Sequence, residues 1–129
     1  MQDLLLLGID ILTALKYLHE VGVVHRDIRL ANCVQLSKKF FMLIDLEGAA
    51  EADRKPPEGF RFTDWTPATL EDGKYTRKSD VKAVGSMLLK SSGGLEMTAE
   101  VNTFLSNLQS GCYSAVEALN SAVLQNCKR

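Results

Sequence analysis

The strongest constraint on the fold is a helical pattern that opens the chain. Over residues 4–21, apolar residues recur at steps of three and four, which places them on one broad face of an α-helix. Gly22 follows this pattern, and glycine is common just after the last turn of a helix. The sequence therefore predicts a helix over 4–21 whose wide apolar stripe must be covered by other elements.

Short β-rich segments follow the predicted helix, at 23–24, 33–36 and 40–44. The last two are separated by the polar turn Ser37-Lys38-Lys39. Strands of this length predict a small hairpin and not an extended sheet. The run 40–44 contains only apolar residues, so we expect it in the core.

The remainder is one long patternless segment followed by helices. Residues 47–70 show no period, and loops of this length in compact domains are usually functional or disordered. Phe60, Phe62 and Trp65 predict that its distal half docks on the core. Helical patterns return at 78–89, with Ser79 or Asp80 as the cap, and then at 101–108 and 116–124. At 129 residues the chain predicts one mostly α-helical domain with a small β-hairpin.

Composition excludes several classes of protein. Fifteen Lys and Arg against sixteen Asp and Glu leave no basic excess, so we expect no nucleic-acid partner. Three cysteines without a C-x-x-C pair predict reduced, buried thiols in a cytosolic compartment. The apolar run 4–7 is preceded by Asp3 and followed by Asp10, which argues against a signal peptide or a membrane span. The expected location is cytoplasmic, with no membrane partner.

One segment carries the chemistry. His25-Arg26-Asp27 is followed by Asn32, five residues after Asp27, and Asp45 stands at the end of the apolar strand segment. This arrangement resembles the protein kinase family, whose catalytic loop reads H-R-D-x-x-x-x-N and whose D-F-G aspartate follows a strand. The resemblance implies the C-terminal lobe of a kinase over 1–129, with a catalytic loop at 25–32 and an activation segment at 45–70.

The same resemblance implies roles for four residues. Asp27 would be the catalytic base, and Arg29 would be the cation near the transferred phosphate. Asn32 and Asp45 would hold Mg²⁺ and, through it, ATP. Phosphoryl transfer needs such groups because its catalysis is mainly positioning and charge stabilisation, and hard cations prefer carboxylate and amide oxygens.

A second block extends the resemblance. Segment 65–70 resembles the family's A-P-E region, and Ser79-Asp80-Val81 resembles the start of its buried central helix. In that family the aspartate of this helix holds the catalytic-loop backbone, which implies the same structural role for Asp80. A plain helix cap is the alternative. We expect His19 to lie at the surface or to cap the first helix, and we expect His25 to be a packing and hydrogen-bonding residue of the loop.

Several features depart from the family pattern. The sequence contains no G-x-G-x-x-G loop and no V-A-I-K lysine, so the N-terminal lobe is absent from it. The D-F-G triplet reads Asp45-Leu46-Glu47, Ala68 replaces the A-P-E glutamate, and Lys82 stands where tryptophan is common. We also consider Thr63 and Thr66 as phosphorylation sites with Arg26 as the phosphate partner.

Two hypotheses remain open. In the first, the complete protein transfers a phosphoryl group from Mg-ATP to a Ser, Thr or Tyr hydroxyl of a protein substrate. In the second, the chain is a catalytically inactive, pseudokinase-type interaction module, or a fragment, that binds a partner protein.

Overall fold

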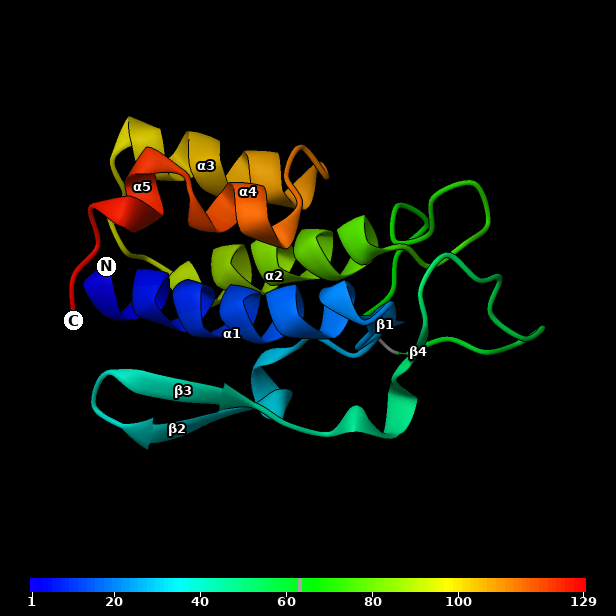
Figure 1. Ribbon diagram of the computed structural model, residues 1–129. Helices are drawn as coiled ribbons and strands as arrows, with labels where there is room; N and C mark the ends of the chain where they lie inside the picture. The colour runs from blue at the N-terminus through cyan, green and yellow to red at the C-terminus, as the bar shows by residue number, and fades with distance from the viewer. Residues whose placement is uncertain (63) are drawn as a thin grey trace.

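Helix α1 (Gln2–Glu20) lies between a β-hairpin and helix α2 (Arg77–Ser92), as Figure 1 shows. The far side of α2 is covered by α3 (Ala99–Gln109), and the short helices α4 (Ala115–Leu119) and α5 (Ala122–Gln125) complete this layer. The computed structural model describes residues 1–62 and 64–129. The prediction of a mostly α-helical fold with a small β part is confirmed.

Helix α1 forms where the apolar period predicted it. Its inner face includes Ile11, Leu12 and Leu15, all with no exposed surface. Gly22 follows the helix with a φ of 79°, in the left-handed region that glycine adopts without strain. A single apolar core joins α1 to the later helices. Its other large members are Val81, Val84, Leu88, Phe104, Leu105 and Leu108.

Helix α2 begins slightly earlier than predicted. Its cap is Thr76, whose hydroxyl accepts a hydrogen bond from the backbone N–H of Ser79, while the Ser79 side chain bonds back to the backbone of Thr76. This reciprocal capping box corrects the expectation that Ser79 or Asp80 is the cap. Further along, Gly85 faces α3 so closely that an added Cβ would lie 2.5 Å from the backbone N of Gln109.

The hairpin consists of β2 (Cys33–Ser37) and β3 (Phe40–Leu43), which pair antiparallel. Phe41 and Leu43 face the core and are half-buried, whereas Phe40 and Met42 are 50% and 45% exposed. The prediction that the whole run 40–44 is core is therefore wrong. Alternate residues of a strand point to opposite faces, and within the described residues only one face of this hairpin is covered.

The long segment after the hairpin is anchored at several points. It contains β4 (Ala50–Glu51), a strand that sequence patterns did not predict. Strand β4 pairs with β1 (Val23–Val24), which forms where a short β segment was predicted. Farther along, the rings of Phe60, Phe62 and Trp65 pack edge to face, and Trp65 stacks on Tyr75. The predicted docking of the distal half is confirmed. Thr63 lies outside the described residues.

The C-terminal part differs in detail from expectation. The predicted helix over 116–124 is two helices, because Ser121 caps α5 through its hydroxyl and so starts a new helix. The three cysteines are free thiols, but Cys112 is exposed and Cys33 and Cys127 are only partly buried, so their predicted burial is wrong. In the described part of the chain, no helix is both long and apolar enough to cross a bilayer.

Candidate functional site

Asp80, at the start of α2, fixes the backbone of the 25–32 loop. Its carboxylate is fully buried and accepts hydrogen bonds from the backbone N–H groups of His25 (2.8 Å) and Arg26 (3.1 Å). Tyr75 donates its hydroxyl to the same carboxylate at 2.6 Å, and burial, followed by the charge of Asp80, holds the pKa of Tyr75 well above its ordinary value. A buried carboxylate needs such donors, so Asp80 acts as an anchor and not as a helix cap.

The two histidines of this region are both interior residues. His19 Nε2 lies 2.9 Å from Asp80 Oδ2, and only 8% of the His19 side chain is exposed. The expectation of a surface or capping role for His19 is therefore wrong. His25 accepts a hydrogen bond at Nδ1 from the backbone N–H of Asp27 (3.1 Å) and pairs through Nε2 with the carbonyl of Ile44 (2.9 Å). The packing role predicted for His25 is confirmed.

Three of the four predicted site residues form one hydrogen-bonded group. The Asp27 side chain is 7% exposed, and its Oδ1 accepts from Arg29 Nε at 3.0 Å. Its Oδ2 accepts from Asn32 Nδ2 at 2.9 Å, and the same Nδ2 donates to the Asp27 carbonyl at 2.8 Å. The carboxylate of Asp27 is thus oriented by a guanidinium on one oxygen and an amide on the other.

Asp45, the fourth predicted residue, is linked to this group through the backbone. The N–H of Ile44 donates to the carbonyl of Asn32 at 2.8 Å, and Asp45 comes next in the chain. Asp45 has a φ of 66°, is exposed, and accepts a hydrogen bond at Oδ1 from the N–H of Glu47 at 3.3 Å. Among the described residues, its side chain makes no hydrogen bond with Asp27, Arg29 or Asn32.

A hollow of about 880 Å³ opens beside Asp27. Its floor comes from α2 through Ala83 and Met87, and its rim comes from the 64–69 segment through Trp65 and Thr66. Lys82 and Lys90 also line it. The hollow places the Asp27 carboxylate at the wall of a cavity large enough for an extended peptide segment.

Arg26 ties the loop to the segment that follows Asp45. Its Nε donates to the carbonyl of Gly48 at 2.5 Å, its guanidinium lies 4.2 Å from the ring centroid of Phe60, and its carbonyl accepts from Trp65 Nε1 at 2.9 Å. Burial lowers the pKa of Arg26. The sequence suggested Arg26 as the partner of a phosphate and did not predict its contact with Phe60. The closely spaced aromatic residues Phe60, Phe62 and Trp65 were the feature that could have indicated this contact.

The neighbourhood of Ala68 is held by a lysine. Lys82 Nζ donates to the carbonyl of Ala68 at 3.1 Å and lies 3.5 Å from a carboxylate oxygen of Glu71. The hydroxyl of Thr76 and then the charge of Lys82 hold the pKa of Glu71 below its ordinary value. Lys82 and Glu71 thus form an ion pair next to Ala68.

The loop, its buried anchor and the strand-end aspartate agree with one family. A sequence model of the protein kinase domain matches residues 3–121. The chain belongs to the protein kinase domain family. It is 36% identical over 95 residues to Crinkler effector protein 8 of Phytophthora infestans, covering 70% of this chain and 16% of that protein. It is 29% identical over 86 residues to the MAP kinase kinase skh1/pek1 of Schizosaccharomyces pombe, covering 65% and 24%.

A solved structure has the same fold. The ROP18 kinase domain in complex with AMP-PNP and sucrose matches with a TM-score of 0.74 and 17% sequence identity, over 94% of this chain and 40% of that one. The fold is therefore that of part of a kinase domain. The chain spans less than a quarter of the length of the two curated relatives above.

Proposed function

We propose that these 129 residues are the C-terminal lobe of a kinase domain, with its catalytic loop at 25–32 and its activation segment at 45–70. In the complete protein, this lobe supports ATP-dependent phosphoryl transfer to a protein hydroxyl in the cytoplasm. The observation that carries the proposal is the group formed by Asp27, Arg29 and Asn32 at the wall of a large hollow.

Asp27 is proposed to bind the acceptor hydroxyl. Its two oxygens keep further lone pairs beyond the hydrogen bonds from Arg29 and Asn32, so the carboxylate can accept the hydroxyl proton without losing its orientation. The hollow beside it, floored by α2 and edged by Trp65, offers room for the chain that carries the hydroxyl. Arg29, 44% exposed, is proposed to hold positive charge near the phosphoryl group.

Asn32 and Asp45 fit a magnesium ion. Both hydrogen bonds of the Asn32 amide use Nδ2, so its oxygen is left for a ligand, and exposed Asp45 contributes carboxylate oxygens. Mg²⁺ is commonly bound by one or two such groups together with waters and phosphates. When bound, Mg-ATP supplies the phosphoryl group and neutralises the charge that develops on it. Asn32 also orients Asp27, so one residue would couple metal binding to the position of the base.

Calorimetric titration of the purified chain with ATP and magnesium tests the proposed metal site, and a radiolabel transfer assay with the complete protein and a protein substrate tests the proposed activity. We expect saturable, magnesium-dependent binding that weakens at least about tenfold in Asp45→Asn. Transfer should fall by about a thousandfold or more in Asp27→Asn, while its nucleotide affinity changes little. Lys128→Ala, at an exposed residue outside the 25–32 and 45–70 segments, is the control and should change neither. Transfer that is unchanged in Asp27→Asn would exclude the proposed role of Asp27.

A non-catalytic binding module is the second candidate. Glu47 favours it, because this acid replaces the family's glycine and its N–H bonds to Asp45, which brings a negative charge close to the proposed metal ligand. Under this alternative the chain binds a partner protein, and neither transfer nor its dependence on Asp27 is seen. Glu47→Gly separates the candidates further, because a gain of magnesium-dependent nucleotide binding would show that Glu47 suppresses it.

A further inference from the structure

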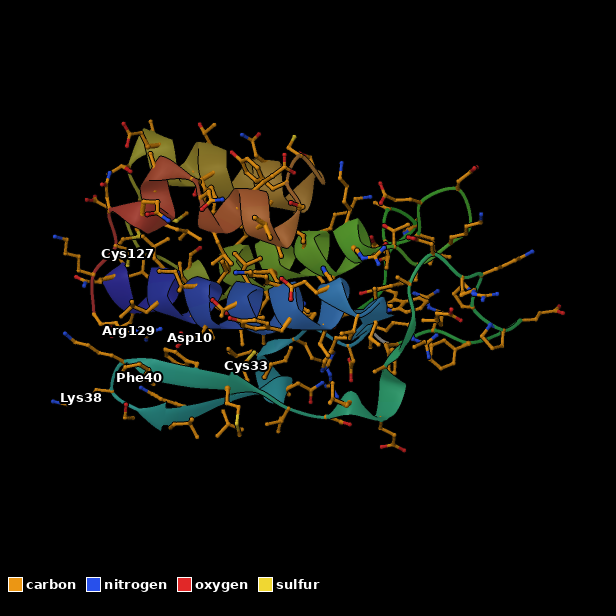
Figure 2. All side chains as sticks on the ribbon, in the orientation of Figure 1. Asp10, Cys33, Lys38, Phe40, Cys127 and Arg129 are labelled. Atoms are coloured by element: carbon orange, nitrogen blue, oxygen red, sulfur yellow. The ribbon has the colours of Figure 1, made fainter. Side chains whose placement is uncertain are left out.

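The outermost part of the hairpin is held by the last residue of the chain. Figure 2 shows Arg129 beside Asp10 of α1 and Phe40 of β3. The guanidinium of Arg129 donates to both carboxylate oxygens of Asp10 and to the carbonyl of Lys39, and its Cζ lies 4.1 Å from the ring centroid of Phe40. We call Arg129, Asp10, Lys39 and Phe40 the C-terminal clamp.

Asp10 is the centre of the clamp because it serves both sides. Its side chain is 13% exposed, and its Oδ2 also accepts a hydrogen bond from the backbone N–H of Phe41 at 2.9 Å. The Asp10 carboxylate therefore binds the hairpin backbone directly and also binds Arg129. Arg129 in turn contacts the Phe40 ring and the Lys39 carbonyl. Two-pronged guanidinium–carboxylate pairs fix orientation better than single contacts do.

The hairpin depends on these contacts for its position. A lone two-stranded hairpin is marginal in water, and β2 is almost entirely exposed, so β2 is held mainly through its pairing with β3. Strand β3 is fixed at one end by the bonds of Ile44 to His25 and Asn32, and at the other end by the C-terminal clamp.

The two proposed metal ligands stand at the base of this hairpin. Asn32 directly precedes β2, and Asp45 follows β3 after a single residue. Asn32 is buried and bonded twice to Asp27, whereas Asp45 is exposed and bonded through its side chain to its neighbour Glu47. Of the two, Asp45 depends more on the course of β3.

We propose that Arg129 is a positioning residue: through Asp10 and Phe40 it sets the course of β3 and so holds Asp45 in the place from which it binds magnesium. That Asp45 binds magnesium rests on the proposed function. That Arg129 positions Asp45 rests on the hairpin contacts. Arg129 thereby has a role in the site, although it is 119 positions away in sequence from its partner Asp10.

The test compares the chain with Arg129→Ala, Arg129→Lys and the control Lys128→Ala, which removes an exposed basic side chain next to Arg129 in the sequence. Two readouts are recorded: backbone amide signals and hydrogen exchange of the hairpin and of 45–47, and the magnesium dependence of binding to a non-hydrolysable ATP analogue. In Arg129→Ala we expect faster exchange at Phe41, shifted amide signals at 45–47, and an about tenfold higher magnesium midpoint. Arg129→Lys should recover part of each change, and Lys128→Ala should show none.

The outcomes separate the two proposals. Unchanged amide signals at 45–47 in Arg129→Ala overturn the positioning role, even where exchange at Phe41 rises, because the clamp would then be structural only. An unchanged magnesium midpoint in a parent chain that binds the nucleotide overturns it as well. A parent chain that binds no magnesium nucleotide contradicts the proposed magnesium site at Asn32 and Asp45 instead, and the amide signals alone then decide whether Arg129 sets the position of Asp45.

Discussion

Single residues in this chain often serve two neighbours at once. Asp80 receives the loop backbone and the Tyr75 hydroxyl, Asn32 orients Asp27 while leaving its oxygen for a ligand, and Asp10 joins the hairpin to Arg129. Such groups are costly to replace, because removing one partner leaves another buried polar atom without a hydrogen bond.

Cys33 provides a test at this scale. Burial between the 25–32 loop and Met87 raises the pKa of its thiol from an ordinary 9.0 to about 11. At pH 9 only about one Cys33 in a hundred is then a thiolate. We expect its alkylation by iodoacetamide, followed by peptide mass spectrometry, to keep accelerating up to about pH 11. Cys33→Ser identifies the peptide, and an alkylation rate that levels off near pH 9 would contradict the raised pKa of this partly buried thiol.

The same shift has a consequence for stability. Because the folded pKa lies above the unfolded one, folding favours the neutral thiol. The contribution of Cys33 is complete below about pH 9 and is lost as the pH rises toward 11.

Helix α2 is the element that joins the site to the core. Its first turn carries the capping box and Asp80, its middle packs on α3 at Gly85, and its outer side forms the floor of the hollow. The sequence predicted the helix and the role of Asp80, but the close approach to α3 depends on how the two helices pack.

Gly85→Ala tests this packing. The added Cβ would meet the backbone of Gln109, which cannot move away as a flexible side chain would, so α2 and α3 must separate. We expect the free energy of unfolding to fall by about 2 kcal/mol, measured by urea denaturation. Gly94→Ala is the matched control, because a Cβ there meets nothing within 4 Å, and it should change stability by less than about 0.5 kcal/mol. Equal effects of the two substitutions would show that the close contact is not present in solution.

The molecule as a whole leaves one face of its hairpin exposed. Leu36 is 61% exposed, and Met42 and Leu46 are also exposed, so the described residues leave an apolar surface next to Asp45. Apolar patches of this kind promote association, and edge strands add unpaired backbone groups to it.

Leu36→Lys is expected to reduce self-association without unfolding the chain. Lysine on an exposed edge strand opposes strand pairing between molecules, and the substituted side chain has few neighbours to lose. Sedimentation velocity should show a monomer at concentrations at which the parent associates, and the free energy of unfolding from urea denaturation should change by less than about 0.5 kcal/mol. Leu12→Ala, in the core, is the contrast and should cost about 3 kcal/mol. A comparable loss in Leu36→Lys would mean that this face is covered within the folded chain.

Local sequence patterns were enough to locate the main helices and the H-R-D motif. Apolar spacing located α1, α2 and α3, the H-R-D-x-x-x-x-N spacing located the loop around Asp27, and a resemblance assigned Asp80 to that loop. These features are readable because a helix period or a loop motif is set by residues only a few positions apart.

Which faces of these elements are buried, and which residues they contact, depends on how the elements pack against one another. This packing exposes Phe40 and Met42, buries His19 against Asp80, places the guanidinium of Arg26 over Phe60, and brings Arg129 to Asp10. Each of these outcomes depends on residues that are distant in the sequence and become neighbours only when the helices and the hairpin pack. The spacing of apolar residues shows that they share one face of a helix or strand. Whether that face is buried depends on whether another part of the chain covers it.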